Sequence, residues 1–130
     1  MEVKRIGYLG VRTDKVAETT AFFRDVLGLE AAGEDETVTF TRLPTHRVDL
    51  VEVYAREHAD DRMIPSDTDF MVSFVVDSVE QARAEMLAAA LEPSEIVWAA
   101  KEFDNPNYGA FAWFFVRAPD GRAYAFQQEP

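Results

Sequence analysis

The chain has 130 residues, with 13 Lys and Arg against 24 Asp and Glu, so its formal net charge at pH 7 is −11. This length suits one domain, and a content of 48% hydrophobic and 28% charged residues excludes a fully disordered chain. The absence of cysteine excludes disulfide frameworks, thiolate metal sites and cysteine nucleophiles. The acidic balance argues against a nucleic-acid partner, because binding to phosphates requires Lys and Arg.

The N-terminal sequence contains no apolar stretch of the kind found in signal peptides. The longest apolar run, Ala110 to Val116, is far too short to span a bilayer. We therefore expect a cytoplasmic protein with no membrane partner.

The first part of the chain predicts a strand followed by a helix. Residues 6–11 alternate loosely between apolar and other side chains, and Thr13-Asp14 then offers a helix N-cap. Gly28 stands where a helix C-cap belongs. The side chains with helical spacing between these caps predict the buried stripe of the helix: Val16, Thr20 (through its methyl group), Phe23, Val26 and Leu27.

The same pattern returns 63 residues further on, where Asp77, Val79 and Ala84 repeat Asp14, Val16 and Ala21. Residues 70–76 predict a strand, and residues 78–81 (Ser-Val-Glu-Gln) have the spacing of a capping box. The buried stripe expected for this second helix consists of Val79, Ala82, Met86, Ala89 and Ala90.

Residues 40–52 and 115–127 repeat each other at an offset of 75 residues. The identical pairs are Phe40/Phe115, Arg42/Arg117, Pro44/Pro119 and Arg47/Arg122. The two offsets differ by 75 − 63 = 12, so the second half carries about twelve extra residues, which we place within residues 98–108.

Each half therefore predicts a strand, a helix and three more strands, which makes the chain a duplicated βαβββ unit of the α+β class. We expect one domain over residues 1–130, with module one at about 1–56, a connection at about 57–67 and module two at about 68–130.

Two motifs and this repeat resemble the vicinal oxygen chelate superfamily, which includes glyoxalase I, extradiol dioxygenases and bleomycin-resistance proteins. Residues 22–29 (Phe-Phe-Arg-Asp-Val-Leu-Gly-Leu) match the segment that closes the first helix of that family, and residues 118–122 (Ala-Pro-Asp-Gly-Arg) match the turn before its last strand. The resemblance implies two tandem modules whose mostly antiparallel strands curl around a cavity, in a protein that is usually a homodimer. Fold alone does not assign a function, because members are enzymes or binding proteins.

The resemblance also implies where a divalent metal would bind, with one ligand on the first and one on the last strand of each module. Those positions fall on Tyr8, Leu50, Met71 and Ala125. A hard divalent cation needs oxygen or imidazole ligands, which Leu and Ala do not provide, and a shift of one residue to Asp49 supplies a single carboxylate. The two histidines, His46 and His58, stand outside these positions. We therefore expect no metal and no other cofactor.

Strand alternation assigns the side chains that face the expected cavity, with Trp113 roughly opposite Ala125 in the last hairpin. Tyr108 and Trp98, near the inserted loop, are candidates for a lid. The candidate ligand-binding residues are Tyr8, Arg12, Leu50, Glu52, Met71, Ser73, Tyr108, Trp113, Phe115, Ala125 and Gln127. The alternative for most of them is ordinary core packing, and for Glu52 it is a structural ion pair with Arg12 or a place at the open rim.

These residues predict a metal-free protein that binds a small aromatic ligand, and the negative charge favours a cationic one, since cations are attracted to aromatic faces. The alternative is an enzyme of this superfamily, a lyase, isomerase or dioxygenase. It would be either metal-dependent through displaced ligands or metal-free through Tyr8 and Glu52 as an acid–base pair. No nucleophile elbow or phosphate-binding Gly-rich loop is present in the sequence.

Overall fold

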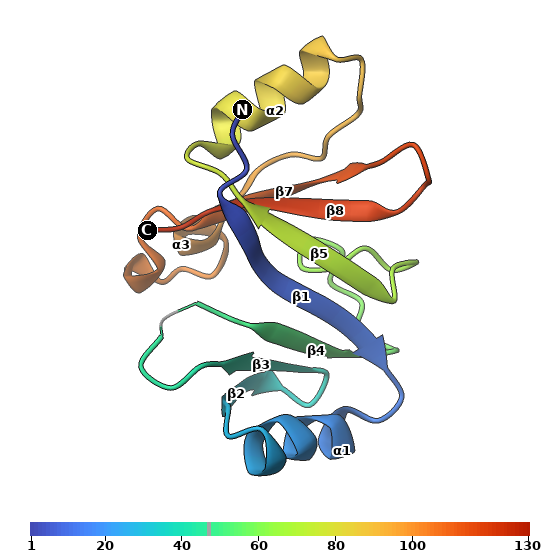
Figure 1. Cartoon of the computed structure of the whole chain (residues 1–130), viewed down its shortest axis with the longest axis vertical. Coiled ribbons are helices and arrows are strands. Elements are labelled where there is room, and N and C mark those ends of the chain that lie inside the picture. The colour runs from blue at the N-terminus through green and yellow to red at the C-terminus, as the bar shows by residue number, and fades with distance from the viewer. Residues whose placement is uncertain (47) are drawn as a thin grey trace. The chain divides into compact units, whose positions relative to one another are not determined.

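The structure is a computed structural model that describes residues 1–46 and 48–130, so the expected match between Arg47 and Arg122 lies outside the described residues. The elements of the described chain are β1 (Arg5–Thr13), α1 (Val16–Ala21), the π-helical turn η1 (Phe22–Val26), β2 (Glu30–Asp35), β3 (Val38–Arg42), β4 (Val51–Ala55), β5 (Phe70–Val75), α2 (Val79–Ala88), β6 (Val97–Trp98), α3 (Ala99–Glu102), the 3-10 turn η2 (Pro106–Tyr108), β7 (Ala112–Arg117) and β8 (Ala123–Gln128). The α+β class is confirmed, and both halves run strand, helix and three strands as expected (Figure 1).

The chain divides into two compact units whose boundaries lie inside strands. The first unit is Gly7–Val72, and the second unit combines Met1–Ile6 with Ser73–Pro130. The N-terminal residues belong to the second unit through contacts beside β5 and α2 (Figure 1). The Lys4 backbone N–H donates to the Val75 carbonyl at 2.9 Å, and the N-terminal amine pairs with Glu85 of α2.

In the first unit the strand order is β2-β3-β4-β1. β2 pairs with β3 and β3 with β4 as antiparallel neighbours, whereas β1 and β4 are parallel. A parallel pair needs a long crossover between its strands, and the segment from α1 to β3 supplies it. The first and last strands of the module therefore lie side by side.

The second unit repeats this connectivity in the order β5-β8-β7-β6, again with the first and last strands, β5 and β8, in parallel. The repeat in the sequence is thus a repeat in topology. α3 and η2 lie between β6 and β7, whereas β2 and β3 are joined by a short turn. The extra residues of the second half therefore form these two short helical turns, within the stretch where the offsets placed them.

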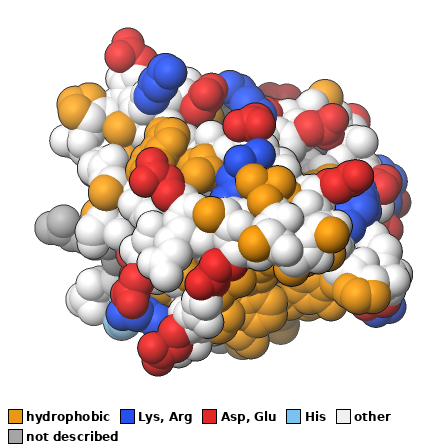
Figure 2. Space-filling view, turned by 90° about the horizontal axis from the view of Figure 1, so that it is seen from above, with side chains coloured by type: hydrophobic (Ala, Val, Ile, Leu, Met, Phe, Trp, Pro, Cys, Tyr) orange, Lys and Arg blue, Asp and Glu red, His pale blue; other side chains and the backbone are white. Residues whose placement is uncertain are grey.

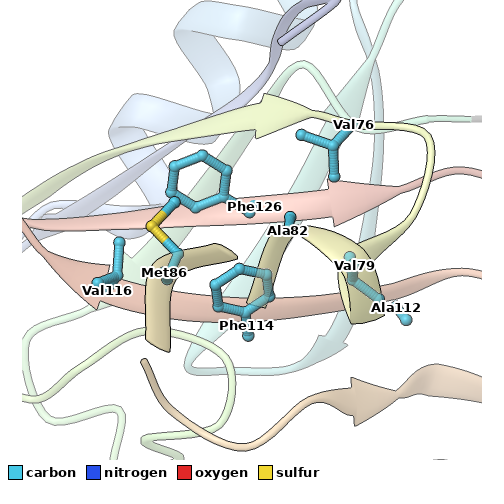
Figure 3. Packing of buried hydrophobic residues seen from close by; sticks show 8 residues of the cluster. All are labelled: Val76, Val79, Ala82, Met86, Ala112, Phe114, Val116 and Phe126. Atoms are coloured by element: carbon cyan, nitrogen blue, oxygen red, sulfur yellow. The ribbon is translucent and has the colours of Figure 1, made fainter. Parts of the chain in front are cut away.

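The core of the second unit lies between α2 and one face of its sheet (Figure 3). Ser78 begins the helix by accepting a hydrogen bond from the Gln81 backbone N–H at 3.2 Å, as the capping-box spacing predicts. The buried side chains of this cluster are Val76, Val79, Ala82, Met86, Ala112, Phe114, Val116 and Phe126. The expectation that Ala89 and Ala90 continue the buried stripe is wrong, because α2 ends at Ala88 and Ala90 turns to a φ of 61°.

The first helix also differs from its expected stripe. Thr20 is buried, but Val26 and Leu27 are 71% and 53% exposed. The physical reason is the change from α-helix to π-helix at Phe22, since a wider turn rotates the following side chains away from the face that α1 buries. Gly28 then ends the helix with a φ of 74°, and Leu29 takes the buried position instead.

Charged side chains of both signs are spread over the surface shown in Figure 2, with acidic and basic groups interspersed. Part of the net charge of −11 is thus carried by solvated surface residues. None of the helices in the described part of the chain is long and apolar enough to cross a bilayer.

Candidate functional site

The expected site residues of the second unit lie on the face of the sheet opposite α2, here called the helix-free face. Ser73 pairs with Ala125 in β8, and Ala125 pairs with Phe115 in β7. Trp113 pairs with Gln127, two residues from the partner expected from the sequence but on the same face. Alternation therefore places these side chains together, opposite the Phe114 and Phe126 rings that pack on α2.

In the first unit, the corresponding face carries side chains from β1 and β4. Gly10 pairs with Glu52 and Arg12 with Tyr54, so these side chains and Tyr8 project from the same side of the sheet. Tyr8, Arg12 and Glu52 are 4%, 6% and 7% exposed, and Tyr54 is fully buried. The alternation inferred from the sequence is thus confirmed for this face.

The strand register corrects one match between the modules. Ser73, two residues after Met71, pairs with Ala125, and Gly10, two residues after Tyr8, pairs with Glu52. The counterpart of Ala125 in the first module is therefore Glu52, and the match of Leu50 to Ala125 is wrong. Phe40 faces Glu52 whereas Phe115 faces Ala125, so the hairpin of the first module is two residues longer, since 52 − 40 = 12 and 125 − 115 = 10.

Glu52 lies in a small polar cluster at the start of β4. The Tyr54 hydroxyl donates to Glu52 Oε1 at 2.5 Å, and the Asp49 carboxyl is within hydrogen-bonding reach of Glu52. Asp49 in turn accepts a hydrogen bond from Arg42 Nη2 at 3.0 Å. The partners of Glu52 are therefore Tyr54 and Asp49, whereas Arg12 binds elsewhere.

Burial raises the pKa of Glu52 well above its ordinary value, because the carboxylate has lost its hydration. The neighbouring Asp49 carboxyl raises this pKa further, and the Tyr54 hydrogen bond and the Arg42 charge lower it. Burial likewise raises the pKa of Tyr54, with a further contribution from the charge of Glu52. The cluster therefore favours a protonated Glu52 and a neutral Tyr54.

Arg12 binds main-chain carbonyl groups of the connection. Its guanidinium donates to six carbonyl oxygens at 2.8–3.5 Å, those of Ala55, Arg56, His58, Ile64, Pro65 and Thr68. A planar guanidinium carries five N–H donors, so these contacts account for its bonding capacity. Arg12 thus fastens residues 55–68 to β1.

The polar candidates of the second unit bind each other. Ser73 donates to Gln127 Oε1 at 2.5 Å, and the two residues are 0% and 2% exposed. Trp113 lies against Phe103, with ring centroids 6.3 Å apart, and Phe103 contacts the Tyr108 ring at 5.7 Å. The inserted turns therefore bring aromatic rings over Trp113.

The three remaining candidates differ in their surroundings. Leu50 precedes β4 and is 37% exposed, and Met71 is buried on β5. Trp98 packs against the α2 cluster, so it lies on the other face from Trp113.

The two histidines have structural partners. His46 contacts the Pro44 carbonyl. His58 contacts the Thr37 hydroxyl at 2.8 Å, and its ring lies tilted against the Tyr54 ring with the centroids 5.0 Å apart. Among the residues that the structure describes, no group of three or more His, Cys, Asp or Glu side chains is placed to hold a metal ion.

Sequence reasoning did not select Tyr54 and Asp49 as site residues. Tyr54 follows Glu52 by two positions, which is the signal for a shared strand face. Asp49 lies before β4, in a segment without regular structure, so alternation gives no orientation for its side chain.

Solved structures with the same fold include enzymes. Over 100% of its length the chain matches a catechol 2,3-dioxygenase with a TM-score of 0.71 at 12% identity, and over 97% it matches the Mn(II)-bound glyoxalase from Novosphingobium aromaticivorans with a TM-score of 0.69 at 21% identity. The chain spans only 43% and 39% of those two proteins. A glyoxalase/bleomycin resistance protein/dioxygenase superfamily member from Vibrio splendidus 12B01 matches with a TM-score of 0.61 at 19% identity, with 96% of this chain and 98% of that chain covered.

At these identities the structural matches show a shared fold. A search of curated proteins gave no significant match. The model of the Glyoxalase/Bleomycin resistance protein/Dioxygenase superfamily matches residues 5–122. Together with the duplicated βαβββ topology, this match shows that the chain belongs to the Glyoxalase/Bleomycin resistance protein/Dioxygenase superfamily.

Proposed function

We propose that the chain is a metal-independent binding protein of this superfamily. It binds a small aromatic ligand and prefers one that carries a positive charge. The observation that carries the proposal is the chemistry of the four positions where the family's enzymes hold a metal. After the register correction, these positions are Tyr8, Glu52, Met71 and Ala125. Catalytic divalent cations bind carboxylate or imidazole groups. Of these four residues, Glu52 alone carries one.

The surroundings of Glu52 also argue against a metal. Its Oε1 atom accepts the Tyr54 hydroxyl hydrogen, and the Asp49 carboxyl lies beside it. A metal at Glu52 would have to displace these interactions, and Tyr8 and Met71 of the same unit offer it no second carboxylate or imidazole. The donor set therefore does not fit a catalytic divalent metal, and no chemical step is assigned to one.

The proposed ligand follows from the side chains beside these positions. In the first unit, Tyr8 and Tyr54 project from the sheet face that carries Glu52. In the second unit, Trp113 and Phe115 project from the sheet face opposite α2. Aromatic rings supply large apolar contact areas and attract cations through their faces, by about 0.5–2 kcal/mol for each contact. The net charge of −11 favours the approach of a cationic ligand.

A thermal-shift screen in EDTA tests this proposal, with aromatic cations, neutral aromatics of matched size and aliphatic cations as the three arms. We expect concentration-dependent stabilisation by aromatic cations that persists in EDTA and weakens in Trp113→Leu. The control variant is Trp98→Leu, since Trp98 packs on the opposite face. Stabilisation that requires added Mn(II), Ni(II), Zn(II) or Fe(II) would contradict the proposal, as would the absence of any stabilising compound.

We also propose that the protein forms a homodimer, supported by the resemblance and by exposed apolar side chains on the first unit. Phe22, Val26, Leu27 and Phe70 are 49–71% exposed, and groups of exposed apolar residues are common at interfaces. Light scattering after gel filtration tests this, and a mass of 14.7 kDa for the particle at micromolar concentration would contradict it.

The second candidate function is metal-free acid–base catalysis. It is favoured by the burial of Glu52, which raises the pKa of that carboxyl in a cluster that also contains Tyr54 and lies beside Tyr8. A carboxyl with a raised pKa can donate or accept a proton near neutral pH. Exchange of deuterium from solvent into a bound carbon acid, lost in Glu52→Gln and retained in EDTA, would support this alternative over simple binding.

A further inference from the structure

The connection between the modules is folded onto the sheet face of the first unit that carries Tyr8 and Glu52. Arg12 binds its carbonyl oxygens, the closest being that of His58 at 2.8 Å and that of Pro65 at 3.1 Å. The Thr68 carbonyl accepts the Arg12 Nε hydrogen at 3.2 Å. Residues 55–68 are therefore held at both ends by one buried guanidinium.

Ile64 is the side chain that this arrangement places on the sheet. It is 0% exposed although it belongs to a loop, and its neighbours Met63 and Pro65 are only partly buried. A methyl group built on Gly10 would lie 3.6 Å from Ile64 Cδ1 and 3.7 Å from Met71 Cε. The Ile64 side chain thus occupies the space above Gly10 that a larger residue on β1 would fill.

Gly10 is the middle of three β1 residues that project from this face, between Tyr8 and Arg12, and it pairs with Glu52. Gly10 carries no side chain, so Ile64 and Met71 pack directly over its backbone. A Cβ atom built on Gly10 would be in van der Waals contact with both side chains.

We propose that Ile64 is a plug that sets the size of the ligand space on the face of the first unit that carries Tyr8 and Glu52. The role of Ile64 in ligand choice rests on the proposed function, because it assumes that this face binds a ligand. A smaller residue at 64 opens an apolar space bordered by Gly10 and Met71, and the connection, fastened by Arg12, keeps the backbone in place. Ile64 is then a specificity-determining residue: it excludes bulky aromatic ligands from the vicinity of Glu52.

The test compares Ile64→Ala and Ile64→Val with wild type in binding a small neutral aromatic probe, benzene, followed by titration calorimetry. Small apolar molecules occupy cavities that removal of a large aliphatic side chain leaves in a fixed backbone. We expect Ile64→Ala to bind one probe per chain at least tenfold more tightly than wild type, with Ile64→Val in between. Met63→Ala, on the same connection, is the matched control and should bind like wild type.

Wild-type probe affinity in Ile64→Ala or Ile64→Val, with native circular dichroism and cooperative unfolding, would overturn the proposal. Equal gains in Met63→Ala would overturn it as well, since the effect would then reflect a loosened loop. The outcome is separable from the proposed function. If no compound in the thermal-shift screen stabilises wild type, the proposed function is wrong, and the probe experiment still decides whether Ile64 is a plug. If ligands stabilise both wild type and Ile64→Ala with the same size preference, only the role of Ile64 is wrong.

Discussion

Tyr54 donates a hydrogen bond of 2.5 Å to Glu52 from two residues further along the same strand, β4. Side chains at positions i and i+2 of a strand share a face, so a single strand positions both groups. The Glu52 carboxyl is buried at a position where the resemblance to this superfamily implies a metal ligand, and its partner is the Tyr54 hydroxyl of the same chain. The pair shares this face with the aromatic ring of Tyr8 and the guanidinium of Arg12.

Glu52→Gln is expected to stabilise the protein increasingly as the pH rises. Burial raises the pKa of Glu52 in the folded state, so the wild type loses stability as the pH rises from the unfolded pKa of this carboxyl through its raised folded pKa. Gln cannot ionise and still accepts the Tyr54 hydrogen. Within this window the difference should grow by up to about 1.4 kcal/mol per pH unit. Urea unfolding from about pH 4 to pH 9 measures it, and parallel curves for the two proteins would refute the assignment.

Tyr54→Phe is expected to destabilise the protein by about 1–3 kcal/mol, because a buried carboxyl loses a hydrogen-bond donor. Combined with Glu52→Gln, the two effects should not be additive, with a coupling of about 0.5–3 kcal/mol. Tyr124→Phe, on β8 with its ring stacked on Phe74, is the control and should lie within about 0.5 kcal/mol of wild type. Additive effects would mean that the Tyr54 hydroxyl does not act through Glu52.

Arg12→Lys is expected to release the connection from β1. Lys retains the positive charge, but three donors on one atom cannot reach the carbonyl oxygens that the guanidinium spans. We expect a loss of roughly 3 kcal/mol in unfolding free energy, since buried carbonyl groups lose their donors. Trypsin should cut after Arg56 and Arg62 at least tenfold faster than in wild type. Unchanged cleavage would show that Arg12 does not hold this segment.

Phe114→Ala is expected to cost about 3–5 kcal/mol, because the ring is fully buried between α2 and the Phe126 ring. Leu87→Ala, on the exposed side of α2, should change the stability by less than about 0.5 kcal/mol. Thermal unfolding followed by circular dichroism compares the two variants. Similar losses in both would contradict the packing of α2 on β7 and β8.

The repeat made the topology predictable from the sequence. The matches of Asp14 with Asp77 and Val16 with Val79 placed two helices after two strands, and strand alternation then assigned Glu52 and Tyr8 to one face. These inferences depend on local periodicity, which each segment carries in its own residues. The same reasoning failed at Val26 and Leu27, since the π-helical turn changes the period that the pattern assumes.

The details of the candidate site depended on features without a local signal. The match of Leu50 to Ala125 assumed hairpins of equal length, and two additional residues in the first hairpin moved the equivalence to Glu52. Ile64 reaches Gly10 from a loop whose carbonyl groups Arg12 binds. Long-range contacts of this kind involve loop residues, whose side-chain directions no periodicity specifies.

A protein that works without a divalent metal should not retain one when it is offered. The protein, purified without a metal-affinity tag, is incubated with Mn(II), Fe(II), Ni(II) and Zn(II), passed through gel filtration and measured by elemental analysis. Because Met71 and Ala125 provide no carboxylate or imidazole and Glu52 is bonded to Tyr54, we predict far less than one metal ion per chain, equal to that in Glu52→Gln. One equivalent of any of these metals in wild type, lost in Glu52→Gln, would contradict the account.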